Sequence, residues 1–189
     1  MSELRDKVAI GVTGLPGAGK TTFTEVARSM GVPVFIMGDV IREEVQKRGL
    51  PLTRENMKFV MKDIREKLGS DIVAKRCCEK VRNVEDKIVV LEGIRSMEEV
   101  RFYKEQFGRF ILVAIHASPR TRYERLKRRG RNDDPKDFSV FTERDFQEIE
   151  VGIAVPLALA DVHLVNEDVS LREFKELCRE AIRRILESV

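Results

Sequence analysis

Short apolar runs alternate along the chain with longer segments in which apolar residues recur at helical spacing. Apolar runs of four to six residues bounded by polar or turn residues are typical of buried strands. The expected strands cover residues 8–13, 34–37, 88–91, 110–115 and 162–165. The expected helices cover residues 20–30, 39–48, 54–67, 71–84, 97–106, a segment opening at 118–119, 139–159 and a last segment after residue 170.

This alternation predicts an α/β fold of three layers. Parallel strands need crossover connections, and the crossover helices then cover both faces of the sheet. We therefore expect a five-stranded parallel sheet flanked by helices. Ligands of such sheets bind beyond the carboxyl ends of the strands, so residues that follow the strands are the first candidates for chemistry.

Two of the expected helices begin with the pattern Ser-x-x-Glu, at Ser96 to Glu99 and at Ser170 to Glu173. In a capping box the serine hydroxyl accepts a hydrogen bond from the third helical amide, and the glutamate carboxylate accepts one from the backbone amide of the serine. Both segments are therefore predicted to start with reciprocal capping boxes.

The run between the first expected strand and helix carries the clearest chemistry. It matches the phosphate-binding pattern G-x-x-x-x-G-K-[ST] without a gap and consists of Gly14, Leu15, Pro16, Gly17, Ala18, Gly19, Lys20 and Thr21, with Thr22 next. Glycines let the backbone amides point at a polyphosphate, and the start of the following helix adds positive potential. Lys20 is expected to reach the β and γ phosphates and Thr21 to ligate Mg²⁺. A nucleoside triphosphate is the predicted ligand, with ATP the default because no guanine-selective N-K-x-D pattern is evident.

The strand at 88–91 ends in Glu92, and a hydrophobic strand followed by an acid is the second signature of this class of nucleotide-binding proteins. The acid of that signature holds Mg²⁺ or its water shell opposite the loop threonine. Because glutamate stands where aspartate is commoner, direct metal contact, contact through water and a role as a base all remain open.

Composition narrows the class of partners. The chain has 189 residues with 35 basic and 32 acidic side chains, a net charge of only +3, which does not favour nucleic acid as a partner. The cysteines (Cys77, Cys78 and Cys178) form no C-x-x-C pair, which indicates a reducing compartment. With no long apolar run and no apolar stretch before the first strand, we expect a cytoplasmic protein without a membrane span or signal peptide.

Three later segments resemble adenylate kinases and their relatives. Gly38 to Arg42 is similar to the G-D-x-[IL]-R segment that holds the acceptor nucleotide. Glu92 to Arg95 is similar to their D-G-[FY]-P-R, one residue shorter and without the proline. Residues 127–134 resemble the start of their mobile LID, and residues 160–166 resemble the last strand of dephospho-coenzyme A kinases.

Across nearly its whole length the chain resembles the small archaeal family described as adenylate-kinase-related. The resemblance implies a single P-loop kinase-like domain over residues 1–189, with an acceptor-binding helical region at about 38–69 and a LID at about 128–145.

The same resemblance suggests roles for several arginines, whose planar guanidinium grips two phosphate oxygens at once. Arg42 and Arg95 are expected to bind the acceptor. Arg131 and Arg144, on either side of the LID, are expected to stabilise charge on the transferred phosphate, with Arg125 a further donor-side candidate. Asp39 has three open interpretations: it orients Arg42, contacts the acceptor, or caps the next helix.

The predicted function is transfer of the ATP γ-phosphoryl group to a small phosphate-bearing acceptor, with Lys20, Glu92, Arg131 and Arg144 as catalytic residues and ATP and Mg²⁺ as cofactors. One alternative is phosphorylation of a hydroxyl, as in dephospho-coenzyme A, with Asp39 or Glu92 as base. Another is a P-loop ATPase switch associated with RNA or protein. The arginines expected at the acceptor argue against a pure switch, which has no second substrate to hold.

Overall fold

The computed structural model describes residues 4–131 and 134–188. Residues 1–3, within the segment where no signal peptide is expected, and residues 132–133, within the LID-like motif, lie outside the described part of the chain. The strands are β1 (Val8–Thr13), β2 (Val34–Ile36), β3 (Ile88–Glu92), β4 (Arg109–His116) and β5 (Val162–Val165). The helices are α1 (Lys20–Ser29), α2 (Met37–Lys47), α3 (Arg54–Leu68), α4 (Ile72–Val81), α5 (Met97–Gln106), α6 (Pro119–Arg129), α7 (Phe138–Val151), α8 (Ala154–Ala158) and α9 (Leu171–Glu187).

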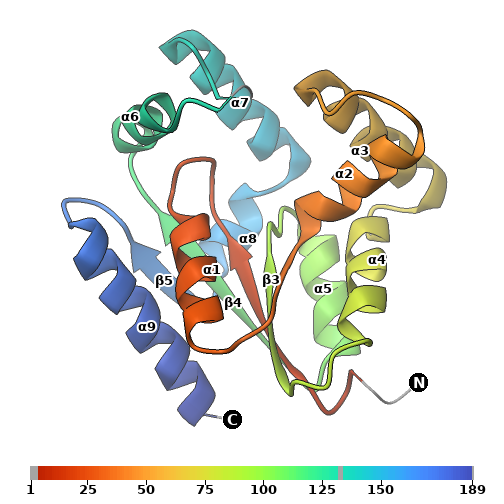
Figure 1. The fold of residues 1–189 in the computed structure, drawn as a ribbon, viewed down its shortest axis with the longest axis vertical. Coiled ribbons are helices and arrows are strands. Elements are labelled where there is room, and N and C mark those ends of the chain that lie inside the picture. Colours follow the sequence, from red (N-terminus) through yellow and green to blue (C-terminus); the bar gives the residue numbers. More distant parts are fainter. Residues whose placement is uncertain (1–3, 132–133, 189) are drawn as a thin grey trace.

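The strands form the expected five-stranded parallel sheet, and their order in it is β2-β3-β1-β4-β5 (Figure 1). The central strand β1 pairs with β3 and β4, so that Val8 lies opposite both Ile88 and Arg109. The chain therefore has the α/β P-loop fold predicted from its pattern.

Successive residues of a strand point to opposite faces of the sheet, and this builds two separate cores. Ala9 and Leu112 face a core formed with α2, α3, α4 and α5. Ile10 and Val113 face a second core formed with α1 and α9. In the described residues, no helix combines the length and apolarity that a membrane crossing requires.

Some local expectations were wrong. The segment 139–159 forms two helices, because Gly152 ends α7 with φ 113°, a left-handed conformation that glycine adopts without strain. The strand at 34–37 ends at Ile36, and α2 begins at Met37, so Asp39 lies in the first turn rather than capping the helix.

The capping box at Ser170 forms as predicted, whereas the one at Ser96 is only half made. Ser96 accepts a hydrogen bond from the Glu99 amide. The Glu99 carboxylate does not return to the cap, because it binds Arg65 and the backbone of Arg95 instead.

Candidate active site

A cleft of about 580 Å³ opens at the carboxyl ends of β1 and β3. One wall is the glycine loop and the start of α1, and the opposite wall comes from α2, α3 and the loop after β3. Residues of α6 and α7 close a third side, so helices on both sides of the glycine loop contribute (Figure 1). This is the sheet edge where the topology predicts a ligand.

The glycine loop is fixed by close packing that only glycine allows. Gly17 has φ 83°, and a Cβ atom there would lie 2.7 Å from the Arg122 carbonyl oxygen. Gly19 has φ 119°, and a Cβ atom there would lie 2.4 Å from Asn166 Nδ2 and 2.9 Å from the Phe174 ring. Gly19 is also the N-cap of α1 and has no side chain to occupy the first-turn amides, which leaves them available to an anion.

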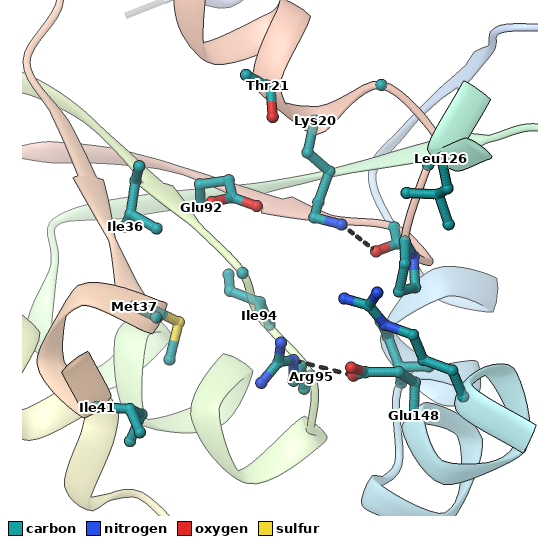
Figure 2. Close-up of a pocket in the computed structure, with 18 of the residues that line it drawn as sticks. Lys20, Thr21, Ile36, Met37, Ile41, Glu92, Ile94, Arg95, Leu126 and Glu148 are labelled. Atoms are coloured by element: carbon teal, nitrogen blue, oxygen red, sulfur yellow. Dashed lines mark hydrogen bonds and ion pairs between the residues drawn. The ribbon is translucent and has the colours of Figure 1, made fainter. Parts of the chain in front are cut away.

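Lys20 lies across the loop, with its Nζ donating to the Gly14 carbonyl at 2.6 Å (Figure 2). Burial lowers the pKa of Lys20, an effect that the nearby Glu92 carboxylate opposes. The amine therefore lies in a poorly hydrated place, where a bound polyphosphate would favour its charged form.

Thr21 and Glu92 line the same part of the cleft (Figure 2). Glu92 is the last residue of β3 and lies opposite Val12 of β1 in the parallel register, which brings it to the edge where the glycine loop begins. A hydroxyl and a carboxylate oxygen are ligands that Mg²⁺ accepts alongside substrate phosphates and water.

Arg42 and Arg95 line the opposite wall. Arg42 is held by an ion pair with Asp39 one turn earlier in α2. Arg95 Nε lies 3.0 Å from a carboxylate oxygen of Glu148, which reaches across from α7 (Figure 2). Of the three interpretations of Asp39, the structure supports orientation of Arg42, and the Asp39 side chain is outside the cleft lining.

Three arginines from the end of α6, the residues after it and α7 gather around Asp134. Arg129 forms an ion pair with Asp134, the Arg131 amide donates to it at 2.9 Å, and Arg144 lies 3.9 Å from it. Burial opposes ionisation of Asp134, but these donors keep its pKa below the ordinary value. Arg125 donates instead to the Asn166 main chain and side chain, at 3.0 and 3.1 Å.

The basic residues of the segment 120–131 lie in three environments: the buried interior, the cleft lining and the exposed surface. Arg122 is 2% exposed and grips both carboxylate oxygens of Asp145, while its Nη1 also lies 3.3 Å from the Pro16 carbonyl oxygen. Arg122 therefore connects the glycine loop to α7. Arg125, Arg129 and Arg131 line the cleft. The remaining basic residues (Arg120, Lys127 and Arg128) are exposed.

Most residues proposed from the sequence meet at this cleft. The lining includes Gly14, Pro16, Gly17, Gly19, Lys20, Thr21, Thr22, Arg42, Glu92, Arg95, Arg125, Arg131 and Arg144. Leu15 and Ala18 belong to the glycine loop but are not part of the lining, and Ala18 is buried beneath it.

The sequence analysis did not single out several polar residues of the cleft and its support. Glu25, Arg65 and Glu148 were not named, and Arg129 and Asn166 were included only within longer segments that resemble known kinases. For two of them a pattern was available. Arg65 follows Met61 by four residues on α3, and Glu148 follows Arg144 by four on α7, and residues four apart share one face of a helix. Asn166 offers no such pattern, because its partner Ala18 is 148 residues away.

Comparison with protein families matches residues 13–141 to the AAA domain. The chain is 43% identical over 179 residues to a UPF0200 protein of Hyperthermus butylicus, covering 95% of both chains. It is 46% identical over 179 residues to a UPF0200 protein of Methanopyrus kandleri, covering 93% of this chain and 89% of that one.

Solved structures share the fold at low sequence identity. TT1252 from Thermus thermophilus superposes with a TM-score of 0.68 at 19% identity, covering 97% of this chain and 98% of that one. A shikimate kinase from Bacteroides thetaiotaomicron superposes with a TM-score of 0.62 at 18% identity, covering 95% of this chain and 98% of that one. A gluconokinase from Sinorhizobium meliloti superposes with a TM-score of 0.57 at 19% identity, covering 97% of this chain and 96% of that one.

Proposed function

This chain belongs to the UPF0200 family, and on that premise we propose that it is an ATP-dependent phosphotransferase acting on a small phosphate-bearing acceptor such as a nucleoside monophosphate. One observation carries the proposal. A single cleft is lined on one wall by the glycine loop with Lys20 and on the opposite wall by Arg42 and Arg95. A cleft lined in this way suits two phosphate-bearing ligands facing each other.

In the proposed reaction the first-turn amides of α1 and Lys20 hold the donor's phosphates. Arg131 and Arg144 neutralise charge that spreads over the oxygens of the transferred group. Arg42 and Arg95 hold the acceptor in line, which makes the transfer effectively unimolecular. A phosphate acceptor is already ionised, so transfer of the phosphoryl group to it requires no strong general base.

Mg²⁺ fits the oxygen donors of this cleft. Thr21 and Glu92 would hold the ion together with donor phosphates, and the ion when bound supplies charge neutralisation at the β and γ oxygens. Among the described residues no group of three or more His, Cys, Asp or Glu side chains could hold a metal by itself.

A hydroxyl acceptor is the second candidate, favoured by the similarity of the fold to proteins described as shikimate kinase and gluconokinase. Such an acceptor would need a base. Asp39 forms an ion pair with Arg42 and is itself outside the cleft lining, whereas Glu92 lines the cleft. Glu92 is therefore the better placed base for this alternative.

The test is incubation of the protein with Mg·ATP and separate acceptors: nucleoside monophosphates, dephospho-coenzyme A, shikimate and gluconate. We expect stoichiometric formation of ADP and a phosphorylated acceptor with at least one member of the panel. ADP formed without consumption of any acceptor would contradict the kinase assignment and favour an ATPase switch.

Replacement of Lys20 by alanine tests the site itself. Loss of one preorganised charge that contacts the transferred group is expected to lower turnover by roughly 10²–10³-fold while the fold is retained. Lys104→Ala is the matched control, because Lys104 is exposed and outside the cleft lining. Turnover at the wild-type rate in Lys20→Ala would remove the basis of the site assignment.

A further inference from the structure

A buried carboxylate supports the acceptor wall of the cleft. Glu99 lies in the first turn of α5 and is 0% exposed. One oxygen accepts from Arg65 Nη2 at 2.6 Å, and the other accepts from the Arg95 backbone amide at 2.8 Å. Burial raises the pKa of Glu99, whereas these two donors favour its ionised form. One carboxylate thus ties α3 to the loop that carries Arg95.

Arg65 presents a charge to the cleft that the sequence motifs do not account for. It lies on α3, lines the cleft, and has a side chain that is 18% exposed. Its Nε atom is buried without a hydrogen-bond partner among residues 4–131 and 134–188. A guanidinium has five N–H donors in a fixed plane, more than the contact with Glu99 uses.

Arg95 already holds a carboxylate inside the cleft. Glu148 reaches it from α7 and is 17% exposed (Figure 2). The residue before it, Gln147, accepts a hydrogen bond from Arg54 of α3 at 3.2 Å. Two successive residues of α7 therefore contact the acceptor wall, and Glu148 shows what kind of group Arg95 can accept there.

On the premise of the proposed phosphotransferase, we infer that Arg65 joins Arg95 in binding an oxyanion of the acceptor. Glu99 is the positioning residue for both arginines. Glu148 forms the ion pair with Arg95 until the oxyanion displaces it. The ligand class is a molecule with a phosphate or carboxylate group, since both offer the paired oxygens that a guanidinium grips. Because Glu99 fixes the Arg65 guanidinium and the Arg95 backbone beforehand, binding requires little reorganisation of α3 and of the loop after β3.

Titration of the full-length chain with inorganic phosphate, and separately with acetate, tests this inference by calorimetry. A Lys20→Ala background weakens phosphate binding at the glycine loop, so that the remaining heat reports the acceptor wall. Tighter binding of phosphate assigns a phosphate-bearing acceptor, tighter binding of acetate assigns a carboxylate, and binding of neither anion overturns the inference.

In that background Arg65→Ala is expected to weaken binding of the preferred anion at least fivefold, and Glu148→Gln to tighten it about three- to tenfold by removing the competing charge. The matched controls are Arg101→Ala and Glu150→Gln, which change the same charges at exposed positions outside the cleft. Both controls should leave the affinity unchanged. If the controls shift affinity as much as the cleft variants do, only overall charge matters and the inference is wrong.

Glu99→Gln is expected to weaken anion binding at least threefold while the affinity for ATP, measured with Lys20 intact, stays within a factor of two. A merely structural role of Glu99 would lower both affinities together and contradict its role as a positioning residue. If Glu99→Gln does not fold, the Arg65 and Glu148 variants still decide the inference.

These titrations require no turnover, so the two proposals can fail separately. If no acceptor is phosphorylated but the anion affinities follow the expected order, the phosphotransferase assignment fails alone. If an acceptor without phosphate or carboxylate is phosphorylated equally fast by wild type and Arg65→Ala, the inference fails alone.

Discussion

Asn166 connects the glycine loop, α6 and the end of β4 through one residue. Its Nδ2 donates to the Ala18 carbonyl beneath the glycine loop at 2.8 Å, and its Oδ1 accepts from Arg125. Its own amide donates to the His116 carbonyl at 2.7 Å, which extends the β4–β5 pairing. Asn166 is 6% exposed, so water cannot readily replace these bonds.

Asn166→Ala is therefore expected to lower the free energy of unfolding by about 1–3 kcal/mol, because it leaves the Ala18 carbonyl buried without its donor. ATP should also bind more weakly, since the loop loses its support. Urea denaturation and a nucleotide titration measure the two effects. Asn83→Ala, at an exposed position, is the control and should change stability by less than about 0.5 kcal/mol. Equal stability of the two variants would contradict the role of Asn166.

At the level of elements, the start of each helix shows how far local sequence decides structure. Ser170 and Glu173 form the reciprocal capping box of α9, since no other group competes for the glutamate in the described structure. At α5 the same pattern gives only the serine half, because Glu99 is taken by Arg65 from α3. Local pattern therefore predicts where a helix begins, while a tertiary contact decides how its cap is made.

Ser170→Ala should destabilise the protein by about 1 kcal/mol through loss of the N-cap hydrogen bond of α9. Ser170→Thr keeps the hydroxyl and should stay within about 0.5 kcal/mol of the wild type. Thermal and urea unfolding of the three proteins measure the differences. A threonine variant as unstable as the alanine variant would show that the serine acts through something other than its hydroxyl.

Most elements could be predicted because their apolar spacing and end residues are local. The errors came where a single residue changed the path, as at Gly152, or where a helix began two residues early, as at Met37. The P-loop and Glu92 could also be predicted to meet, because parallel strands carry their following residues to one edge. Arg65 and Glu148 were missed although helical spacing places them on the faces of Met61 and Arg144, because local spacing does not say which helix faces meet at the cleft.

At the scale of the whole molecule, the two cores on either face of the sheet each contain buried cysteine. Cys77 and Cys78 belong to the core with α2 to α5, and Cys178 belongs to the core with α1 and α9. Burial raises the pKa of Cys77 to about 11 and those of Cys78 and Cys178 to about 12. The folded protein should thus hold these thiols protonated and out of contact with reagents at pH 8.

Labelling with a thiol reagent at pH 8 is expected to be slow for all three cysteines and to accelerate together on addition of urea, because one sheet joins both cores in a cooperative unit. Mass spectrometry of proteolytic fragments assigns each site. The denatured protein supplies the reference rate. Faster labelling of Cys178 than of Cys77 and Cys78 in native buffer would mean that the α1–α9 face opens independently.

The central position of β1 also has a consequence for how the chain folds during synthesis. Val8 pairs with Ile88 and Arg109, so β1 has neither neighbour in the sheet until those strands leave the ribosome. At roughly 5–20 residues per second, β1 waits on the order of 4–20 s as an unpaired apolar segment. The strand that leads into the glycine loop is thus made before either of its neighbours, and it stays exposed to aggregation while the chain emerges.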